Sequence, residues 1–227
     1  MSGGNRSGDP TLMFLHPVGL DAQCVEFLDL APVLAPTFPG HGYRRRARAG
    51  LTLDDMADEV LGWTSGPMDV VGASLGGMVA LHLALNHPGR VRSLVLACTT
   101  GYVDPLVMEA RAEVTETRGS LDMVSDTLAR WFSPEVLERE PNDAFVEYAR
   151  ARLVQMETGA LADTWRAIAG LRDLSTPREV MADLANGLPN ARLIEMDAPH
   201  MAFLEKPQEF SHLVREHLDW VRGSVGP

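Results

Sequence analysis

A short strand that turns sharply into a helix around one serine constrains this fold more than any other sequence feature. Residues 69–81 read DVVGASLGGMVAL, in which two valines run into a glycine, Ser74 follows, and apolar residues then recur at helical spacing. Gly72 and Gly76 flank the serine at positions where a sharp strand-to-helix turn leaves no room for a side chain. The pattern predicts a serine exposed at the tip of a tight turn. The structural alternative is a glycine-rich helix start that Ser74 caps.

Length, charge and cysteine content exclude several classes of protein. The 227 residues are 45% hydrophobic and 22% charged, with a net charge of −11 at pH 7, and fit one globular domain. An acidic chain is a poor partner for nucleic acid, and no apolar run reaches the roughly 18 residues of a membrane span. Cys24 and Cys98 fit neither a disulfide framework nor a metal-binding spacing. We expect a cytoplasmic protein, monomeric or homodimeric, that binds no nucleic acid, membrane, metal or cofactor.

Short apolar runs alternate with helical patterns along most of the chain. This alternation predicts an α/β domain with a mainly parallel sheet of about six strands, in the order 2-1-3-4-5-6, flanked by helices. Residues 101–160 break the rhythm and contain only helical patterns, so we expect a helical cap there and a core of residues 1–100 and 161–227. The predicted strands are 11–16, 33–38, 68–72, 93–97, 164–169 and 191–196, and the predicted helices outside the cap are 22–30, 53–63, 75–87, 177–188 and 207–221.

Two further residues fit the chemistry of an activated serine. A serine hydroxyl attacks a carbonyl when a base takes its proton and a third group orients that base, and in this architecture the order is Ser, then Asp or Glu, then His. His200 follows the last predicted strand in MDAPHMAFLEKP and should reach the same sheet edge as Ser74. Asp173, after the preceding predicted strand, is the expected acid, although it could instead cap the next helix. Asp104 is the rival acid.

An oxyanion hole requires two N–H donors aimed at the oxygen on which negative charge develops. Leu75, directly after the serine at the helix start, is expected to supply one of them. The loop HPVGLD after the first strand should supply the other, and there Pro17 has no N–H whereas Val18 has one. His16, in the same loop, is expected to be structural and not a second base.

With these residues the chain resembles the α/β-hydrolases, and most of all the 3-oxoadipate enol-lactonases and related small esterases. The resemblance implies a nucleophile at Ser74, an acid at Asp173, a base at His200, and oxyanion donors at Val18 and Leu75. Members of the family usually begin with an antiparallel hairpin, and we expect this sheet to lack it because about ten residues precede the first predicted strand. The similar segments are FLHPVGLD, APTFPGHG, VVGASLGGMVALHLALNHPGRVRSLVLACTT, ARWFSPE, AGLRDLSTP and PHMAFLEKP.

The sequence therefore predicts a serine hydrolase that cleaves a small-molecule carboxylic ester or lactone through an acyl-serine. The alternatives are C–C bond hydrolysis, thioester hydrolysis or perhydrolysis on the same triad, or a hydrolase-derived ligand-binding protein with little turnover. The basic stretch YRRRAR at 43–48 is either a solvated loop or an attractor of an anionic substrate. A set of large apolar residues either lines a pocket or forms the core of the cap: Met108, Met123, Trp131 and Phe132.

Overall fold

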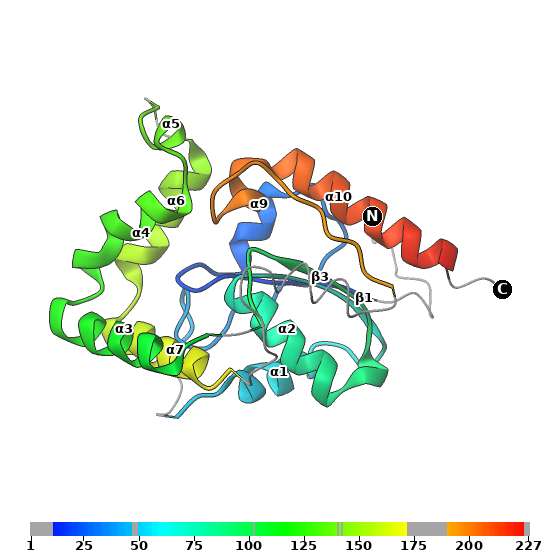
Figure 1. Cartoon of the computed structure of the whole chain (residues 1–227), viewed down its shortest axis with the longest axis horizontal. Helices are drawn as coiled ribbons and strands as arrows, with labels where there is room; N and C mark the ends of the chain where they lie inside the picture. The colour runs from blue at the N-terminus through cyan, green and yellow to red at the C-terminus, as the bar shows by residue number, and fades with distance from the viewer. Residues whose placement is uncertain are drawn as a thin grey trace.

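A parallel sheet lies at the centre of the molecule (Figure 1). The computed structural model describes residues 11–46, 50–101, 103–139, 141, 143–171 and 190–224. Within these ranges the sheet has three strands, β1 (Thr11–Leu15), β2 (Met68–Ala73) and β3 (Val91–Ala97), in the order β1-β2-β3. Gly72 of β2 is paired with Leu15 on one side and Leu96 on the other. All six residues of β2 are buried, as expected for a central parallel strand covered on both faces.

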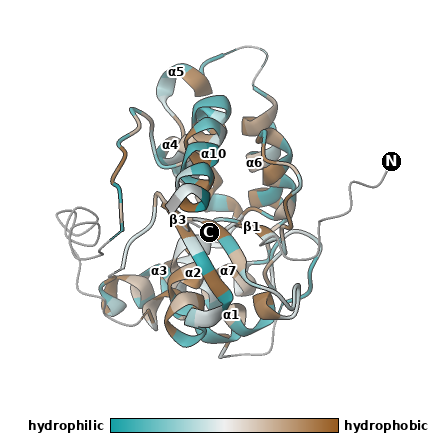
Figure 2. Ribbon diagram, turned by 90° about the vertical axis from the view of Figure 1, so that its right-hand side faces the viewer, coloured by the Kyte–Doolittle hydropathy of each residue, from teal (hydrophilic) through white to brown (hydrophobic). Residues whose placement is uncertain are grey.

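Helices cover both faces of the sheet. α1 (Leu53–Leu61) and α2 (Leu75–Asn86) lie on one face, below the sheet in Figure 1. The 3₁₀-helix η1 (Ala22–Phe27), α9 (Ala202–Glu205) and α10 (Pro207–Ser224) lie on the other. Successive residues of β1 point to opposite faces of the sheet. Met13 therefore joins the hydrophobic cluster between the sheet and helices α1 and α2, whereas Phe14 joins the cluster between the sheet and α10. Hydrophobic and hydrophilic residues alternate along α10, as Figure 2 shows, because one side of this helix is buried.

After β3, which follows the short 3₁₀-helix η2 (Pro88–Arg90), the chain forms a group of helices beside the sheet. α3 and α7 pack side by side at the bottom of this group, and α4, α5 and α6 rise from them (Figure 1). The helical stretch begins after residue 101, as expected, and continues past residue 160. The division into core and cap stays a prediction. The members of the group are α3 (Pro105–Arg118), η3 (Leu121–Met123), α4 (Val124–Trp131), α5 (Pro134–Leu137), α6 (Ala144–Gln155) and α7 (Thr158–Ala169).

The predicted strand 164–169 is wrong, because these residues form the second half of α7. Leu161, Trp165 and Ile168 are buried, at spacings of four and three residues that place them on one helical face. A window of six residues that starts at Thr164 contains too little of this repeat to show the helical period. The segment expected to be the strand before Asp173 is therefore part of a helix.

The segments 33–38 and 191–196 also differ from the prediction. The first contributes only a parallel bridge between Leu34 and Met13. Pro36 within the segment and Pro32 and Pro39 beside it lack the N–H groups that the hydrogen bonds of a β-ladder need. The second has no strand partner among the described residues, since the segment expected beside it is helical. The order of the three strands present agrees with the prediction, and the α/β fold class is confirmed. The predicted helix 177–188 and Asp173 lie outside the described residues.

A search of the helices in the described ranges finds none of the length and hydropathy that a membrane span needs.

Candidate active site

Ser74 occupies a strained turn between β2 and α2. Its φ of 51° and ψ of −114° are uncommon for a residue with a side chain, a conformation that costs on the order of 1–3 kcal/mol. Hydrogen bonds hold the turn in this shape. The Ser74 N–H donates to the Ala97 carbonyl at 2.9 Å, and the Ser74 carbonyl accepts from the Gly77 N–H at 2.9 Å and from the Thr99 hydroxyl at 2.7 Å. The turn thus fixes the serine where the strand ends.

The glycines around Ser74 are required by close packing. A Cβ on Gly72 would overlap the backbone of Gly76, and a Cβ on Gly76 would overlap the Leu15 carbonyl of β1. Neither contact can be relieved by rotating a side chain. Gly77 has the same constraint, because its Cβ would lie 2.6 Å from the Thr99 Cβ. The spacing of Gly72 and Gly76 therefore has the physical cause that the sequence predicted, and the need for Gly77 appears only in three dimensions.

The structure brings His200 to Ser74. The distance from His200 Nε2 to Ser74 Oγ is 3.1 Å, across a separation of 126 residues in the chain. Two other histidines are engaged elsewhere: His82 Nδ1 lies 2.7 Å from the Asp54 carboxylate, and His87 Nε2 lies 3.0 Å from that of Asp58. The pair that the sequence predicted is therefore the pair that the fold assembles.

Three effects lower the pKa of His200. Desolvation is the largest, and the positive charges of Arg130 and Arg111 follow. The residue keeps contact with solvent, yet enough protein surrounds its ring to disfavour the charged form. A lowered pKa keeps the imidazole neutral at pH 7, which is the form that accepts a proton.

The turn between α4 and α5 holds the segment that carries His200. The Met201 N–H donates to the Trp131 carbonyl at 3.0 Å. The Ser133 N–H and hydroxyl both donate to the Glu205 carboxylate, at 3.0 and 2.8 Å. The segments RWFSPE and PHMAFLEKP are thus in direct contact. The sequence analysis identified both only as segments similar to those of a family. We call the Ser133–Glu205 pair and the Met201–Trp131 bond the base-loop clamp.

His16 fixes the loop after β1 that carries Val18. Its Nε2 accepts from the Phe38 N–H at 2.9 Å, so its Nδ1 carries the proton and donates to the Pro17 carbonyl at 2.8 Å. Burial lowers its pKa well below the ordinary value. His16 is therefore structural, as expected. Val18 and Leu75 are both buried, and neither N–H donates to another residue in the described ranges.

A buried carboxylate ties the same loop to α6. Asp21 is 4% exposed, and its side chain accepts from the Tyr148 hydroxyl at 2.7 Å. The Asp21 N–H donates back to the Tyr148 oxygen at 3.2 Å, and Arg152 Nε forms an ion pair with the Asp21 carboxylate at 2.8 Å. No local sequence pattern indicates this contact, because Asp21 and Tyr148 are 127 residues apart.

Of the two candidate acids, Asp104 and Asp173, the structure describes only Asp104. Asp104 is the N-cap of α3, where its carboxylate accepts from the Leu106 N–H at 2.9 Å. This bond gives Asp104 a helix-capping role. Asp173 lies outside the described residues, and its role as the acid stays a prediction.

Two of the four arginines in the basic stretch at 43–48 pair with the chain's own carboxylates. Arg44 pairs with Glu59, and Arg46 makes a two-pronged ion pair with Asp163 in α7. Residues 47–49 lie outside the described part of the chain. Paired guanidinium groups offer little to an anionic substrate, so the solvated-loop interpretation fits Arg44 and Arg46.

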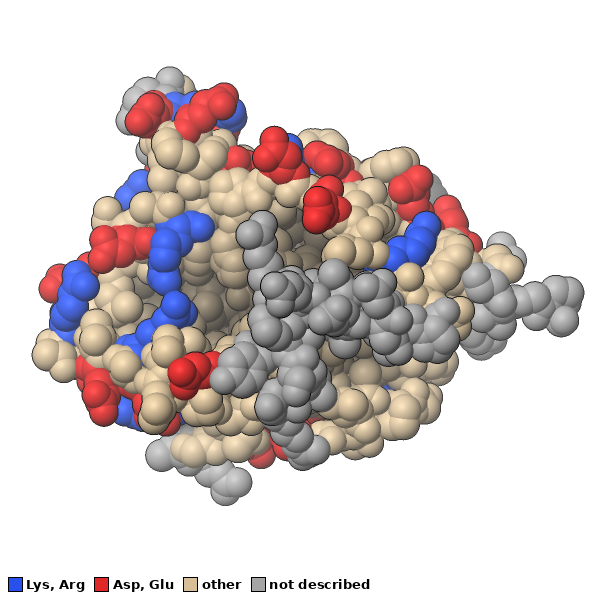
Figure 3. All heavy atoms as spheres, in the orientation of Figure 1, with Lys and Arg blue, Asp and Glu red and all other residues tan. Residues whose placement is uncertain are grey.

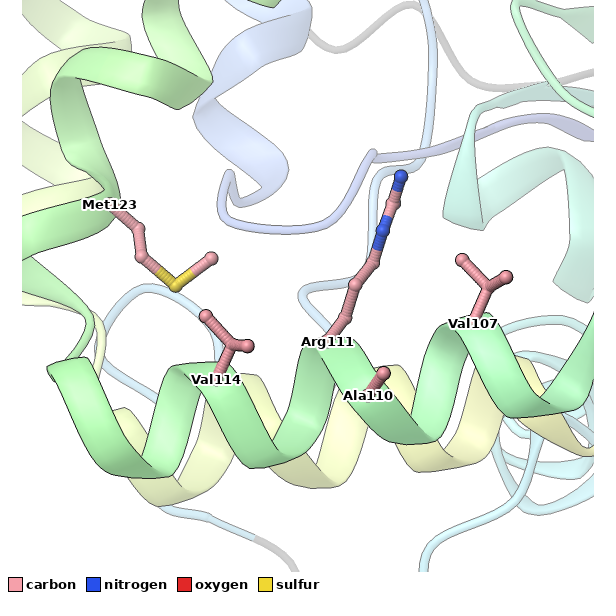
Figure 4. A pocket seen from close by; sticks show the side chains of 5 residues that line it. All are labelled: Val107, Ala110, Arg111, Val114 and Met123. Carbon is pink, nitrogen blue, oxygen red and sulfur yellow. The ribbon is translucent and has the colours of Figure 1, made fainter.

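A pocket of about 290 Å³ opens along α3, lined by Val107, Ala110, Arg111, Val114 and Met123 (Figure 4). Of the four apolar residues expected either to line a pocket or to form a core, Met123 lines this pocket. Met108, Trp131 and Phe132 are buried in the hydrophobic clusters.

Known proteins resemble the chain over nearly its whole length. It is 30% identical to the pimeloyl-[acyl-carrier protein] methyl ester esterase of Chromobacterium violaceum, over 92% of this chain and 94% of that protein. It is 24% identical to 3-oxoadipate enol-lactonase 2 of Acinetobacter baylyi, over 90% of this chain and 87% of that protein. The crystal structure of the enol-lactonase from Burkholderia xenovorans LB400 superposes with a TM-score of 0.83 at 23% identity, over 95% of this chain and 94% of that chain.

The sequence model of the alpha/beta hydrolase family matches residues 12–213, which include the strained turn at Ser74 and the loop at His200. The chain therefore belongs to the alpha/beta hydrolase family and is an enzyme with esterase and lactonase relatives.

Proposed function

We propose that this enzyme hydrolyses a carboxylic ester or lactone through an acyl-serine intermediate formed on Ser74. The observation that carries the proposal is the 3.1 Å distance between Ser74 Oγ and His200 Nε2 at a strained strand-to-helix turn. A serine within hydrogen-bond reach of a neutral imidazole can lose its proton as it attacks. The lowered pKa of His200 supports the neutral form at pH 7.

In the first half-reaction, Ser74 Oγ attacks the carbonyl carbon while His200 Nε2 takes the hydroxyl proton. The carbonyl oxygen becomes an oxyanion, which we assign to the N–H groups of Val18 and Leu75 because neither donates to another described residue. The tetrahedral intermediate then loses the leaving alkoxide, which takes the proton from His200. The acyl group remains on Ser74.

In the second half-reaction, water attacks the acyl carbon and gives its proton to His200 Nε2. Collapse of the second tetrahedral intermediate breaks the bond to Ser74 Oγ, which recovers the proton and releases a carboxylic acid. We assign Asp173 to accept a hydrogen bond from His200 Nδ1, which would keep Nε2 free to act as the base. This assignment rests on the chain order and on the family resemblance.

The relatives support an oxygen leaving group on an acyl carbon. One is named for a methyl ester and another for an enol-lactone, and in both kinds of substrate an oxygen leaves an acyl carbon. We therefore propose an ester or lactone of a small acyl group as the substrate.

Covalent labelling tests the nucleophile. A fluorophosphonate probe should modify the wild-type protein once, on the peptide that contains GASLGG, and should not modify the Ser74→Ala variant. Ser93→Ala is a matched control, because the Ser93 hydroxyl donates to Asp69 at the opposite end of the sheet. Labelling that persists in Ser74→Ala would refute the assignment.

Steady turnover of p-nitrophenyl acetate is expected, whereas one burst without turnover would favour a binding protein.

A further inference from the structure

The loop after β1 carries Val18, and we call residues 16–21 the Val18 loop. It begins beside the turn that presents the candidate nucleophile, because a Cβ on Gly76 would lie 2.0 Å from the Leu15 carbonyl oxygen. The two hydrogen bonds of His16 fix the first part of the loop. Contacts with α6, a helix far away in the sequence, fix its second part.

Asp21, the last residue of the Val18 loop, is held from several sides. Its Oδ1 accepts from the Tyr148 hydroxyl at 2.7 Å and from the Gln23 N–H at 3.0 Å, and its Oδ2 lies 2.8 Å from Arg152 Nε. The Asp21 N–H donates to the Tyr148 oxygen at 3.2 Å, so one hydroxyl contacts both the backbone and the side chain of this residue. A buried ion pair adds little net stability to a fold, but a connected set of hydrogen bonds fixes the position of its members.

α6 also packs directly on the middle of the Val18 loop. Gly19, the residue after Val18, has a φ of 78°, and a Cβ there would lie 2.7 Å from Leu153 Cδ2 and 3.2 Å from Trp131 Cη2. Figure 3 shows a hollow in the face that carries α3 and α4, so the helical group does not pack fully against the sheet over this face. The contacts of α6 with the Val18 loop therefore link two parts of the molecule that a hollow separates elsewhere.

The Tyr148 ring is placed by contacts that do not involve its hydroxyl. Its centroid lies 5.4 Å from that of the Phe27 ring and 5.6 Å from the guanidinium carbon of Arg152. Burial is the largest of the effects that raise the pKa of Tyr148, so the hydroxyl keeps its proton and can donate it at neutral pH. A change to phenylalanine thus removes the hydrogen bonds to Asp21 and keeps the ring contacts.

We propose that Tyr148 is a positioning residue for the reaction, because its hydroxyl holds Asp21 and thereby keeps the Val18 N–H in the place that receives the oxyanion. A donor that is fixed in advance stabilises the developing charge without reorganisation, whereas a donor on a loosely held loop must be ordered during the reaction. The inference rests on the proposed function, which assigns the oxyanion to Val18 and Leu75.

Steady-state kinetics on p-nitrophenyl acetate test the proposal with Tyr148→Phe. We expect kcat and kcat/KM to fall together, each at least about tenfold, because the oxyanion forms only in the transition state. The acid limb of the pH profile should stay in place, since the change does not touch His200. A Tyr148→Phe variant with the kcat of the wild type would overturn the inference.

Ser211→Ala is the matched control, because it also removes one buried hydroxyl that accepts a backbone N–H from a loop. Ser211 accepts from the Asp29 N–H at 3.0 Å and ties α10 to the loop after η1. This variant should keep kcat within about twofold of the parent. An equal loss of kcat in Ser211→Ala and Tyr148→Phe would overturn the inference, because the effect would then reflect a general loss of stability.

An inhibitor pair reports on the oxyanion itself. Hexyl trifluoromethyl ketone accepts Ser74 Oγ at its carbonyl carbon while the serine proton passes to His200, which leaves a negative oxygen like that of the transition state. The corresponding secondary alcohol cannot react in this way. The preference for the ketone over the alcohol should fall at least about tenfold in Tyr148→Phe and should persist in Ser211→Ala. A preference that Tyr148→Phe leaves unchanged, or that the wild type lacks, would overturn the inference.

Amide hydrogen exchange separates this inference from the proposed function. Exchange in residues 16–24 is measured by mass spectrometry in the Ser74→Ala variant, with and without Tyr148→Phe, and α1 is the reference region. Faster exchange in residues 16–24 alone would support the tie between Tyr148 and the Val18 loop, even where labelling refutes Ser74 as the nucleophile. Unchanged exchange would overturn the inference, even where labelling of Ser74 succeeds.

Discussion

The carboxylate of Asp104 already serves the first turn of α3, where it accepts the Leu106 N–H. We therefore expect Asp104→Asn to cost less than about 1 kcal/mol of stability, because the asparagine side-chain oxygen can still accept this bond, and to keep kcat within about tenfold of the parent. Asp173→Asn should fold but lose at least about a hundredfold in kcat, because an imidazole without its acid can adopt the wrong tautomer. Steady-state kinetics on a p-nitrophenyl ester, together with thermal unfolding, checks both variants. The reverse pattern would make Asp104 the acid.

The pH dependence of the reaction should follow the charge on His200. The base must be neutral, so kcat/KM falls as the pH drops through the pKa of His200. Arg130 lowers that pKa, and its removal in Arg130→Gln should raise it and move the acid limb of the profile to higher pH. The measurement uses a neutral ester, so that binding of a carboxylate does not contribute. Arg118→Gln, which removes the same charge from a position paired with Asp126, should leave the acid limb in place, and an unshifted Arg130→Gln profile would contradict the expectation.

Residues with a strong local pattern were predictable, and residues positioned by distant contacts were not. Gly72 and Gly76 reveal the turn at Ser74 because all of the steric constraint lies within a few residues and one neighbouring strand. Arg111 is one of many charged residues on a predicted helix, and only the packing of α3 on α7 shows which side it faces. Its effect on the pKa of His200 has no local sequence signal.

Among the elements, the base-loop clamp gives a test of positioning. Ser133→Ala and Glu205→Gln each weaken the contact that holds the segment carrying His200. We expect kcat to fall roughly tenfold in either variant with little change in KM, because a displaced base affects the chemical step more than binding. The double variant should be about as slow as the slower single variant, since both changes remove one interaction.

Two comparisons separate positioning from a general loss of stability. Ser133→Thr, which keeps the hydroxyl, should recover most of the lost rate. Glu209→Gln, at an exposed position in α10, should leave kcat unchanged. Variants of Ser133 and Glu205 that lower the melting temperature without lowering kcat would show that the clamp only stabilises the fold.

Element prediction succeeded where local residues mark the ends of an element and failed where they do not. The helix after Ser74 was predicted to run from 75 to 87 and ends at Asn86, because the sharp turn marks its start and Pro88 excludes the residue before it from a helix. The segment 164–169 taken alone resembles a strand, and the apolar residues before it are needed to complete the buried face of α7. Residues 33–38 have strand-like composition, but their prolines limit them to a bridge.

For the molecule as a whole, the alternation of strands and helices was enough to predict the α/β class. The net charge of −11 was also visible in the sequence, but its distribution was not. The basic stretch that contains Arg44 and Arg46 was compatible with a solvated loop or with an attractor for anions. In the structure these two arginines pair with Glu59 and Asp163, which belong to other elements. Ion pairs of this kind depend on tertiary packing, so clusters of charge in a sequence do not identify a charged surface.

The contact between Ser74 and His200 has a kinetic consequence, because it closes a loop of 126 residues. Closing a long loop lowers the conformational entropy of the chain before the contacts between its ends have formed to offset that loss. The segment with His200 should therefore dock late in folding. Far-UV circular dichroism should therefore recover before esterase activity when the denatured enzyme is diluted into buffer. Coincident recovery in stopped-flow and activity traces would instead indicate one concerted step. If folding proceeds in this order, the recovery of catalytic activity marks its last step.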